Sequence, residues 1–168
     1  LYNIPSIGVR FFTVYGPWGR PDMAPMIFTK SILKKEPINV FNFGKMQRDF
    51  TYIDDIVESL LCLLDKPATS NLHFDFQNPD PSTSFAPHRI FNIGNSKPIE
   101  LLKFIEELEN VLGIKASLKM LPMQQGDVEI TYANTEELQE WIGYNPSTNL
   151  KDGIKYFVNW YLKYYGKK

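Results

Sequence analysis

Near its start the chain reads Ile7-Gly8-Val9-Arg10-Phe11-Phe12-Thr13-Val14-Tyr15-Gly16-Pro17. β-Branched and aromatic residues dominate this run and Gly16-Pro17 stops it, a pattern typical of a buried strand that ends in a loop. The loop Trp18-Gly19-Arg20-Pro21-Asp22 follows, and a helix is expected over about 24–35, ended by Pro37. A strand that leads through a loop into a helix is the first indication of an α/β protein.

Strands and helices continue to alternate along the rest of the chain, which predicts an α/β fold class. Further strands are expected at 38–41, 47–53, 89–94 and 116–121. Further helices are expected from Asp55 to Leu64 after an Asp54 N-cap, from near Pro98 to Leu112, after an Asn134 N-cap to Gly143, and over 150–165. Residues 68–88 are rich in Asn, Asp, Ser, Thr and Pro, and are expected to form a long surface loop, the segment most prone to disorder.

The composition excludes several classes of partner. The net charge of −1 over 168 residues gives no basic field for nucleic acid or an anionic membrane. No apolar stretch approaches the roughly 20 residues needed to span a bilayer, and no signal peptide opens the chain. The single cysteine, Cys62, lies in an apolar run and is interpreted as a buried hydrophobe. Because one cysteine cannot form an internal disulfide, we expect a reducing compartment and a soluble, cytoplasmic protein. His73 and His88 lack the spacing of a zinc site, and no metal is expected.

Thr13 and Arg20 form the first candidate constellation, seven residues apart around the end of a strand. In open α/β sheets ligands bind beyond the carboxyl ends of the strands. A hydroxyl and a guanidinium at that place suit a polar, anionic ligand, because arginine grips phosphate with two parallel hydrogen bonds. The alternative is a loop arginine that points into solvent.

Phe41, Arg48 and Phe50 form the second constellation. An aromatic ring can stack on a base, and a nearby cation can offset a pyrophosphate, so this group suits a nucleoside diphosphate. Because Asp49 directly follows Arg48, a local ion pair is the alternative.

Gln124-Gln125-Gly126-Asp127 forms the third constellation, between an expected strand and an expected helix. Glycine lets the backbone come close to a ligand, and an aspartate can accept hydrogen bonds from ribose hydroxyls. A plain turn also accounts for this stretch.

Two features of a complete dinucleotide-dependent enzyme are missing from the sequence. There is no glycine-rich phosphate loop after a strand. A tyrosine with a lysine four residues later occurs only as Tyr164 and Lys168, at the chain end. Any catalytic residues are therefore expected to lie outside this chain.

Four stretches together resemble UDP-glucuronate 4-epimerases, which are extended short-chain dehydrogenases. They are Arg10 to Ala24 (RFFTVYGPWGRPDMA), Arg48 to Ile56 (RDFTYIDDI), Phe91 to Asn95 (FNIGN) and Leu121 to Val128 (LPMQQGDV). The likeness covers nearly the whole chain in order, apart from 68–88. The first and last stretches are the more specific, since the other two are shared by the wider superfamily.

The resemblance implies a role for each candidate residue. Thr13 would face the sugar and its carboxylate, and Arg20 would reach the diphosphate or carboxylate. Phe41 would lie against the uracil with the Asn39 backbone beside it. Arg48 would pair with the diphosphate, and Asp127 would order the ribose end. Relatives that act on UDP-glucose often have an arginine where Gln124 stands, so one phosphate contact is absent here.

The resemblance also implies the fold and the reaction. The chain would be the C-terminal part of such an enzyme, holding the last strands of a Rossmann-like sheet and a small α/β substrate-binding lobe. Residues 5–16, 51–65 and 88–95 would complete the NAD-domain sheet and its flank, and 17–50 and 96–168 would form the lobe. NAD, bound mainly by the other half, would oxidise C4 of UDP-glucuronate to a 4-keto sugar and return the hydride on the opposite face, giving UDP-galacturonate.

Three alternatives remain at this point. The whole enzyme could be a UDP-glucuronate decarboxylase, or another NAD-dependent UDP-sugar epimerase or dehydratase. The chain could also be a non-catalytic nucleotide-sugar-binding module. For the epimerase, the resemblance implies a homodimer that serves polysaccharide precursor synthesis, and a chain that is inactive without the cofactor-binding half.

Overall fold

The computed structural model describes residues 2–166 and confirms the α/β class. Its strands are β1 (Ser6–Phe11), β2 (Thr13–Tyr15), β3 (Ile38–Val40), β4 (Gln47–Tyr52), β5 (His88–Ile93), β6 (Pro98–Glu100) and β7 (Leu118–Met120). Its α-helices are α1 (Ala24–Lys34), α2 (Ile53–Leu64), α3 (Leu101–Leu112), α4 (Glu136–Ile142) and α5 (Leu150–Tyr164), and a 3-10 turn, η1, covers Phe41–Gly44.

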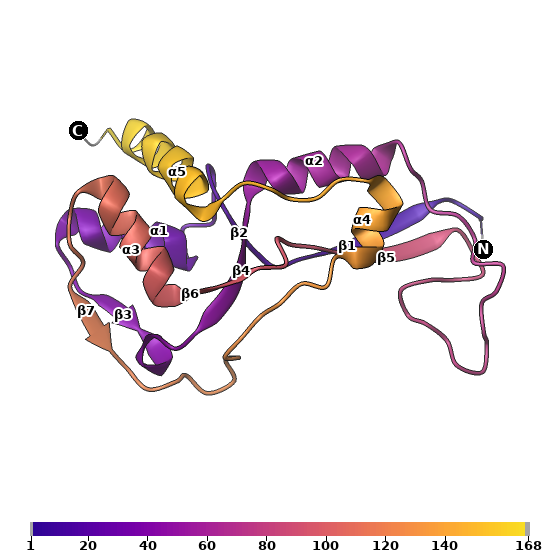
Figure 1. The fold of residues 1–168 in the computed structure, drawn as a ribbon, viewed down its shortest axis with the longest axis horizontal. Helices are drawn as coiled ribbons and strands as arrows, with labels where there is room; N and C mark the ends of the chain where they lie inside the picture. Colours follow the sequence, from indigo (N-terminus) through magenta and orange to yellow (C-terminus); the bar gives the residue numbers. More distant parts are fainter. Residues whose placement is uncertain (1, 167–168) are drawn as a thin grey trace.

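The strands form three small sheets that run through an elongated molecule (Figure 1). β1 pairs in parallel with β5, and β3 pairs in parallel with β7. Between them, β4 pairs in parallel with β2 on one side and antiparallel with β6 on the other. The middle strands thus connect two ends of the molecule: α1, α3, α5, β3 and β7 gather at the C-terminal end, and α2, α4, β1 and β5 at the other.

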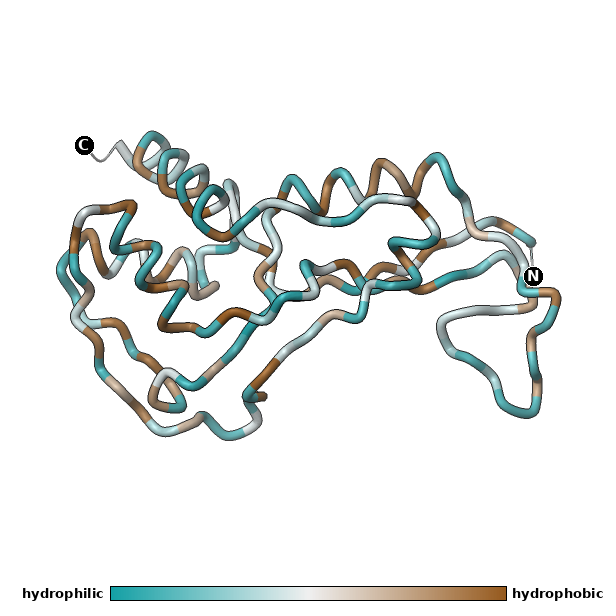
Figure 2. Tube along the Cα trace, in the orientation of Figure 1, coloured by the Kyte–Doolittle hydropathy of each residue, from teal (hydrophilic) through white to brown (hydrophobic). Residues whose placement is uncertain are grey.

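The C-terminal end, which we call the larger lobe, holds the larger hydrophobic core. Phe104 of α3 and Phe157 of α5 are fully buried there, and the Phe104 ring stacks on Phe50 of β4 with centroids 4.2 Å apart. Hydrophobic and hydrophilic residues alternate around α1 and α3 with helical periodicity, as the colours in Figure 2 show. The helical spacing of Leu150, Ile154, Phe157, Tyr161 and Tyr165 predicts one buried face for α5. Ile154, Phe157 and Tyr161 are buried, whereas Tyr165 is 46% exposed.

The other end, which we call the β1–β5 layer, has a smaller core. Ile56 of α2 and Ile93 of β5 pack there with Leu138 and Ile142 of α4. The resemblance implied that α4 belongs to the substrate-binding lobe, within 96–168. The apolar face of α4 packs in the β1–β5 layer instead. The Asp55 carboxylate accepts hydrogen bonds from Tyr144 Oη at 3.0 Å and Thr148 N at 3.1 Å, which ties the segment after α4 to α2.

Several local expectations were wrong. The strand expected over 7–15 breaks at Phe12, and β1 is only half-buried, because within residues 2–166 it pairs on one edge only. Pro98 lies in β6 before α3 rather than in the first turn of the helix. Asp54 is not an N-cap, since α2 begins at Ile53. Asn134 lies one residue before the Thr135 N-cap of α4, and its Oδ1 accepts from Glu136 N.

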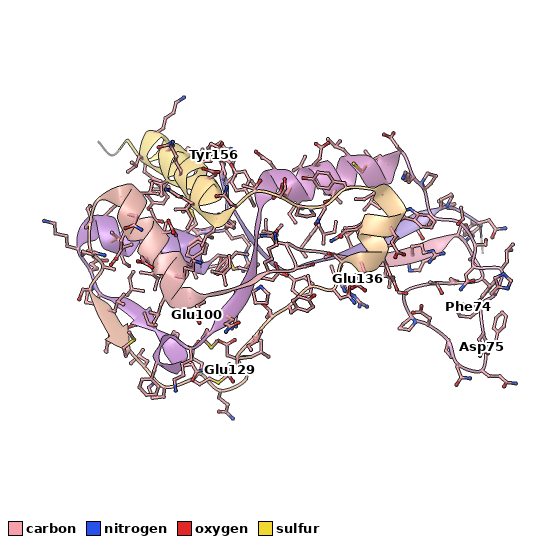
Figure 3. The ribbon with its side chains drawn as sticks, viewed as in Figure 1. Phe74, Asp75, Glu100, Glu129, Glu136 and Tyr156 are labelled. Atoms are coloured by element: carbon pink, nitrogen blue, oxygen red, sulfur yellow. The ribbon has the colours of Figure 1, made fainter. Side chains whose placement is uncertain are left out.

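The expected surface loop 68–88 has no helix or strand up to residue 87, since β5 begins at His88, and it projects from the end of the molecule that holds the N-terminus (Figure 1). The labelled Phe74 lies in this loop (Figure 3), and its ring packs edge-on against Phe76 with centroids 5.1 Å apart. Within residues 2–166, every helix is too short or too polar to cross a lipid bilayer.

Candidate functional site

A large cavity lies in the larger lobe, between α1, the β3–η1 segment, β4 and the segment after β7. Its volume is about 710 Å³, within the range of about 300–1,000 Å³ that is usual for small-molecule sites. Five of the six candidate residues line it: Thr13, Asn39, Phe41, Arg48 and Asp127. The residues that line the cavity lie up to 114 positions apart in the chain, from Thr13 to Asp127.

Arg48 is anchored on the cavity wall by three hydrogen bonds. Its Nη1 donates to the carbonyl oxygens of Gln47 at 2.9 Å and Glu129 at 3.1 Å. Its Nη2 donates to Asp127 Oδ1 at 2.8 Å, and the Arg48 side chain is only 17% exposed. A guanidinium has five N–H donors, so Arg48 keeps two that have no partner among residues 2–166.

Asp127 and Asp49 take different roles. Asp127 Oδ1 accepts from Arg48 and from Val128 N, while Asp127 Oδ2 makes no hydrogen bond within residues 2–166. The local ion pair between Arg48 and Asp49 does not form. The buried Asp49 carboxylate instead accepts from the backbone N–H groups of Asn95, Ser96 and Ala133, at 2.9–3.0 Å.

Phe41 and Asn39 reach the cavity from β3 and the tight turn η1. Asn42 and Phe43 have φ values of +49° and +50°, a left-handed conformation that is rare for a bulky residue such as Phe43. Phe43 N donates to Leu121 O at 3.0 Å, and Leu121 N donates to Val40 O at 2.9 Å. These bonds hold the turn beside the segment that carries Asp127 and so fix where Phe41 lies.

Thr13 begins β2, directly after the break that ends β1, and pairs with Phe50 of β4. It therefore lies at the carboxyl end of β1 rather than at the end of one long strand. Thr13 lines the cavity together with Asn39 and Phe41, and it is half-buried.

Arg20 is the one candidate residue that does not line the cavity. It lines a second hollow of about 330 Å³, formed mainly by residues 11–20, and its side chain is 74% exposed. Its Nε and Nη2 donate to the two carboxylate oxygens of Asp22, at 3.2 and 2.5 Å. This hydrogen-bonded ion pair raises the pKa of Arg20 and lowers the pKa of Asp22 from their usual values.

Two further residues were missed by the sequence reasoning. Asp22 lines the large cavity, and Met23 lines both the cavity and the second hollow, so the loop that carries Arg20 forms the wall between them. Their position two and three residues after Arg20 was the available signal. Tyr15 also lines the second hollow, and burial raises the pKa of its phenol.

The described residues contain no glycine-rich phosphate loop. The glycines that follow strands support internal packing instead of leaving open space for a phosphate. A Cβ added at Gly16 would lie 2.5 Å from Ile53 Cγ2, and one added at Gly94 would lie 2.4 Å from Ala133 Cβ. Residues 2–166 also gather no cluster of three histidine, cysteine, aspartate or glutamate side chains that could hold a metal ion.

Comparison with known proteins identifies the relatives of the chain. Residues 1–99 match the model of the NAD dependent epimerase/dehydratase family. The chain is 51% identical over 167 residues to Protein CapI of Staphylococcus aureus, covering 99% of this chain and 50% of that protein. It is 44% identical over 166 residues to the probable UDP-glucuronate 4-epimerase of Rhizobium meliloti, covering 98% of this chain and 49% of that protein.

The fold of the chain also resembles solved structures. The UDP-glucuronic acid 4-epimerase of Bacillus cereus, solved with UDP-glucuronic acid and NAD, superposes with a TM-score of 0.79 at 29% identity. The match covers 98% of this chain and 47% of that one, so the chain spans about half the length of the relatives it matches. The family model, the relatives and the fold agree, and the chain belongs to the NAD dependent epimerase/dehydratase family.

Proposed function

We propose that this chain is the UDP-sugar-binding half of an NAD-dependent epimerase that inverts C4 of UDP-glucuronate through a 4-keto intermediate. The observation that carries the proposal is the anchored Arg48, which faces the same cavity as Phe41 and Asp127. A cation, an aromatic ring and a carboxylate around one hollow are the groups that a uridine diphosphate needs.

Arg48 is suited to the diphosphate. Its three hydrogen bonds to protein groups fix the guanidinium before a ligand arrives, so binding costs little side-chain entropy. Its two remaining N–H donors can bind phosphate oxygens. Asp127 contributes twice, because its Oδ1 holds Arg48 while its Oδ2 remains able to accept from a ribose hydroxyl.

Phe41 and Asn39 are suited to the base. The left-handed turn η1 holds the Phe41 ring at the cavity wall, where it can stack on uracil, and the Asn39 backbone lies beside it on β3. Stacking reads only the face of the ring, so discrimination between bases needs hydrogen bonds such as those of the Asn39 backbone.

Thr13 and Arg20 are suited to the sugar end. A hydroxyl and a guanidinium can hold a sugar carboxylate away from the geometry in which a 4-keto acid loses CO2. Binding energy from Arg48 at the diphosphate would help to hold the intermediate there. Arg20 now pairs with Asp22, but both side chains are exposed, and such surface pairs exchange at low cost.

NAD would be bound mainly by the other half of the enzyme, because residues 2–166 present no glycine-rich phosphate loop. When bound, NAD supplies the hydride acceptor, and we assign no step of hydride or proton transfer to this chain. Its residues bind and orient the nucleotide sugar.

Calorimetric titration of UDP and UDP-glucuronate into wild type and Arg48→Ala tests the diphosphate assignment. Losing a charged hydrogen-bonding group should weaken UDP binding by roughly 10- to 100-fold. Lys45→Ala is the matched control, a nearby exposed cation outside the cavity, and should bind as wild type does. Equal binding by wild type and Arg48→Ala would contradict the assignment.

Product analysis with the protein joined to its NAD-binding half tests the reaction. UDP-galacturonate with CO2 retained is the expected product. UDP-xylose with release of CO2 would identify a decarboxylase instead.

A further inference from the structure

Trp18 has an unusual backbone and unusual neighbours. Its φ is +62°, a left-handed conformation that costs free energy for a residue with a bulky side chain. Its side chain is still 73% exposed, so burial of the ring does not account for the conformation. Backbone strain of this kind persists only where surrounding contacts impose it.

The turn Gly16-Pro17-Trp18-Gly19, closed by Gly19 N donating to Gly16 O at 3.3 Å, places Trp18 in this conformation. The contacts of its ring come from α5. The Trp18 ring lies 4.9 Å from Tyr164 in an edge-on arrangement and 5.5 Å from Trp160, centroid to centroid. Trp160 and Tyr164 stack on each other at 5.3 Å, one helical turn apart. Aromatic pairs at such distances attract one another beyond the area that they bury. The three rings therefore join α5 to the loop 16–23.

The loop 16–23 is the wall between the two hollows. Arg20 lines the second hollow, Asp22 lines the large cavity and Met23 lines both. No residue of α5 lines either hollow. A shift of the loop would move the Arg20–Asp22 pair, while Arg48 and Phe41 on other elements would stay in place.

We propose that Trp18, Trp160 and Tyr164 form an aromatic clasp that positions the loop 16–23, and through it Arg20, for the sugar end of the ligand. Trp160 and Tyr164 are thus positioning residues remote from the ligand. The ligand part of this inference rests on the proposed function, since it requires Arg20 to face an anionic sugar.

Trp160→Leu is the decisive variant, because Trp160 lines neither hollow and leucine keeps an apolar helix-forming side chain against Phe157. Trp18→Gly is the second variant, since glycine adopts positive φ without strain. Tyr156→Leu is the matched control. Tyr156 is also an exposed α5 aromatic, labelled in Figure 3, but its ring packs on Tyr52 rather than on Trp18.

Hydrogen exchange in the ligand-free, full-length protein tests the clasp. The amides of Gly19 and Met23 donate to Gly16 O and Arg20 O within the loop. Their exchange should become roughly 10-fold faster in Trp160→Leu and Trp18→Gly, and stay unchanged in Tyr156→Leu. Wild-type exchange in both clasp variants would overturn the proposal.

Binding and turnover of the same proteins test the effect on the ligand. The clasp variants should bind UDP as wild type does, while the KM for UDP-glucuronate rises about 5- to 10-fold and kcat changes by less than about twofold. The effects of Trp18→Gly and Trp160→Leu should not add in the double variant, because both break one contact. An unchanged KM, or additive effects, would overturn the positioning role.

The two proposals fail in different ways. If wild type binds neither UDP nor UDP-glucuronate, the proposed function is wrong, and the exchange measurement still decides whether the clasp exists. If wild type binds both and the clasp variants keep the wild-type preference, only the clasp is wrong.

Discussion

The larger lobe and the β1–β5 layer both contain helices with an apolar face, but they bury those faces to different extents. In the larger lobe, α3 and α5 bury Phe104, Leu108 and Phe157 completely. In the β1–β5 layer, α2 covers one side of the strands but leaves Leu61 51% and Leu64 76% exposed. An apolar helix sequence thus does not by itself complete a core, because the opposing surface must also be present.

The uncovered surface of the layer is a groove between β1 and α2. Its volume is about 610 Å³ and its lining is apolar, with Ile7 and Val9 on the strand side and Leu60, Leu61 and Leu64 on the helix side. Exposed apolar patches of this kind mark surfaces that associate with other protein. The larger lobe is therefore expected to supply most of the stability, and the layer most of the tendency to associate.

The largest expected effect comes from matched leucine truncations in the two regions. Leu108→Ala in α3 should lower the free energy of unfolding by about 3–5 kcal/mol, because it leaves a closed cavity. Leu60→Ala in α2 should cost about 2 kcal/mol or less, because Leu60 is only half-buried and lines a groove that water already reaches. Urea denaturation of both variants measures this. Equal losses would show that the layer is as well packed as the larger lobe.

A smaller effect is expected from adding one methyl group in each region. A Cβ at Gly153 of α5 would lie 2.1 Å from Tyr15 Oη, so Gly153→Ala should cost about 1–3 kcal/mol by overpacking. A Cβ at Gly8 of β1 would meet nothing closer than Ile90 Cγ1 at 3.5 Å. Gly8→Ala should therefore be neutral or slightly stabilising. Thermal unfolding of the two variants, with Tyr15→Phe as a partial rescue of Gly153→Ala, checks the difference.

The smallest effect on stability is expected at the exposed side of the groove. Leu61→Glu should change the free energy of unfolding by less than about 0.5 kcal/mol, because Leu61 is half exposed. It should nevertheless reduce concentration-dependent self-association, which sedimentation velocity measures. Self-association that persists unchanged would place the associating surface elsewhere.

Sequence patterns predicted well those features that depend on neighbouring residues. The periodicity of Ile154, Phe157 and Tyr161 predicted most of the buried face of α5, and only Tyr165 at its end is exposed. The helix α3 ends at Leu112 and α4 ends before Gly143, as expected. Caps were predicted less well. Asp54 and Asn134 have the right residue types, but each stands within a residue or two of the true boundary.

Local sequence patterns did not predict the features that depend on contacts between residues far apart in the chain. The pairing of Arg48 with Asp127 joins positions 79 apart, whereas the sequence suggested a contact with the adjacent Asp49. Arg20 lies outside the large cavity and pairs with Asp22, and the loop that carries it contacts α5 through Trp18 and Tyr164. The residues of the candidate site could be named from the sequence, but not their partners.

The buried Asp49 carboxylate has a consequence for how the protein folds. It joins β4 to Asn95 and Ser96 and, across 84 positions, to Ala133. Contacts between such distant positions form late, because closing the long loops between them costs chain entropy before the contacts can stabilise the fold. The segment that carries Asp127 is thus fixed only when nearly all of the chain has assembled, and recovery of UDP binding after denaturation should follow the slowest refolding phase.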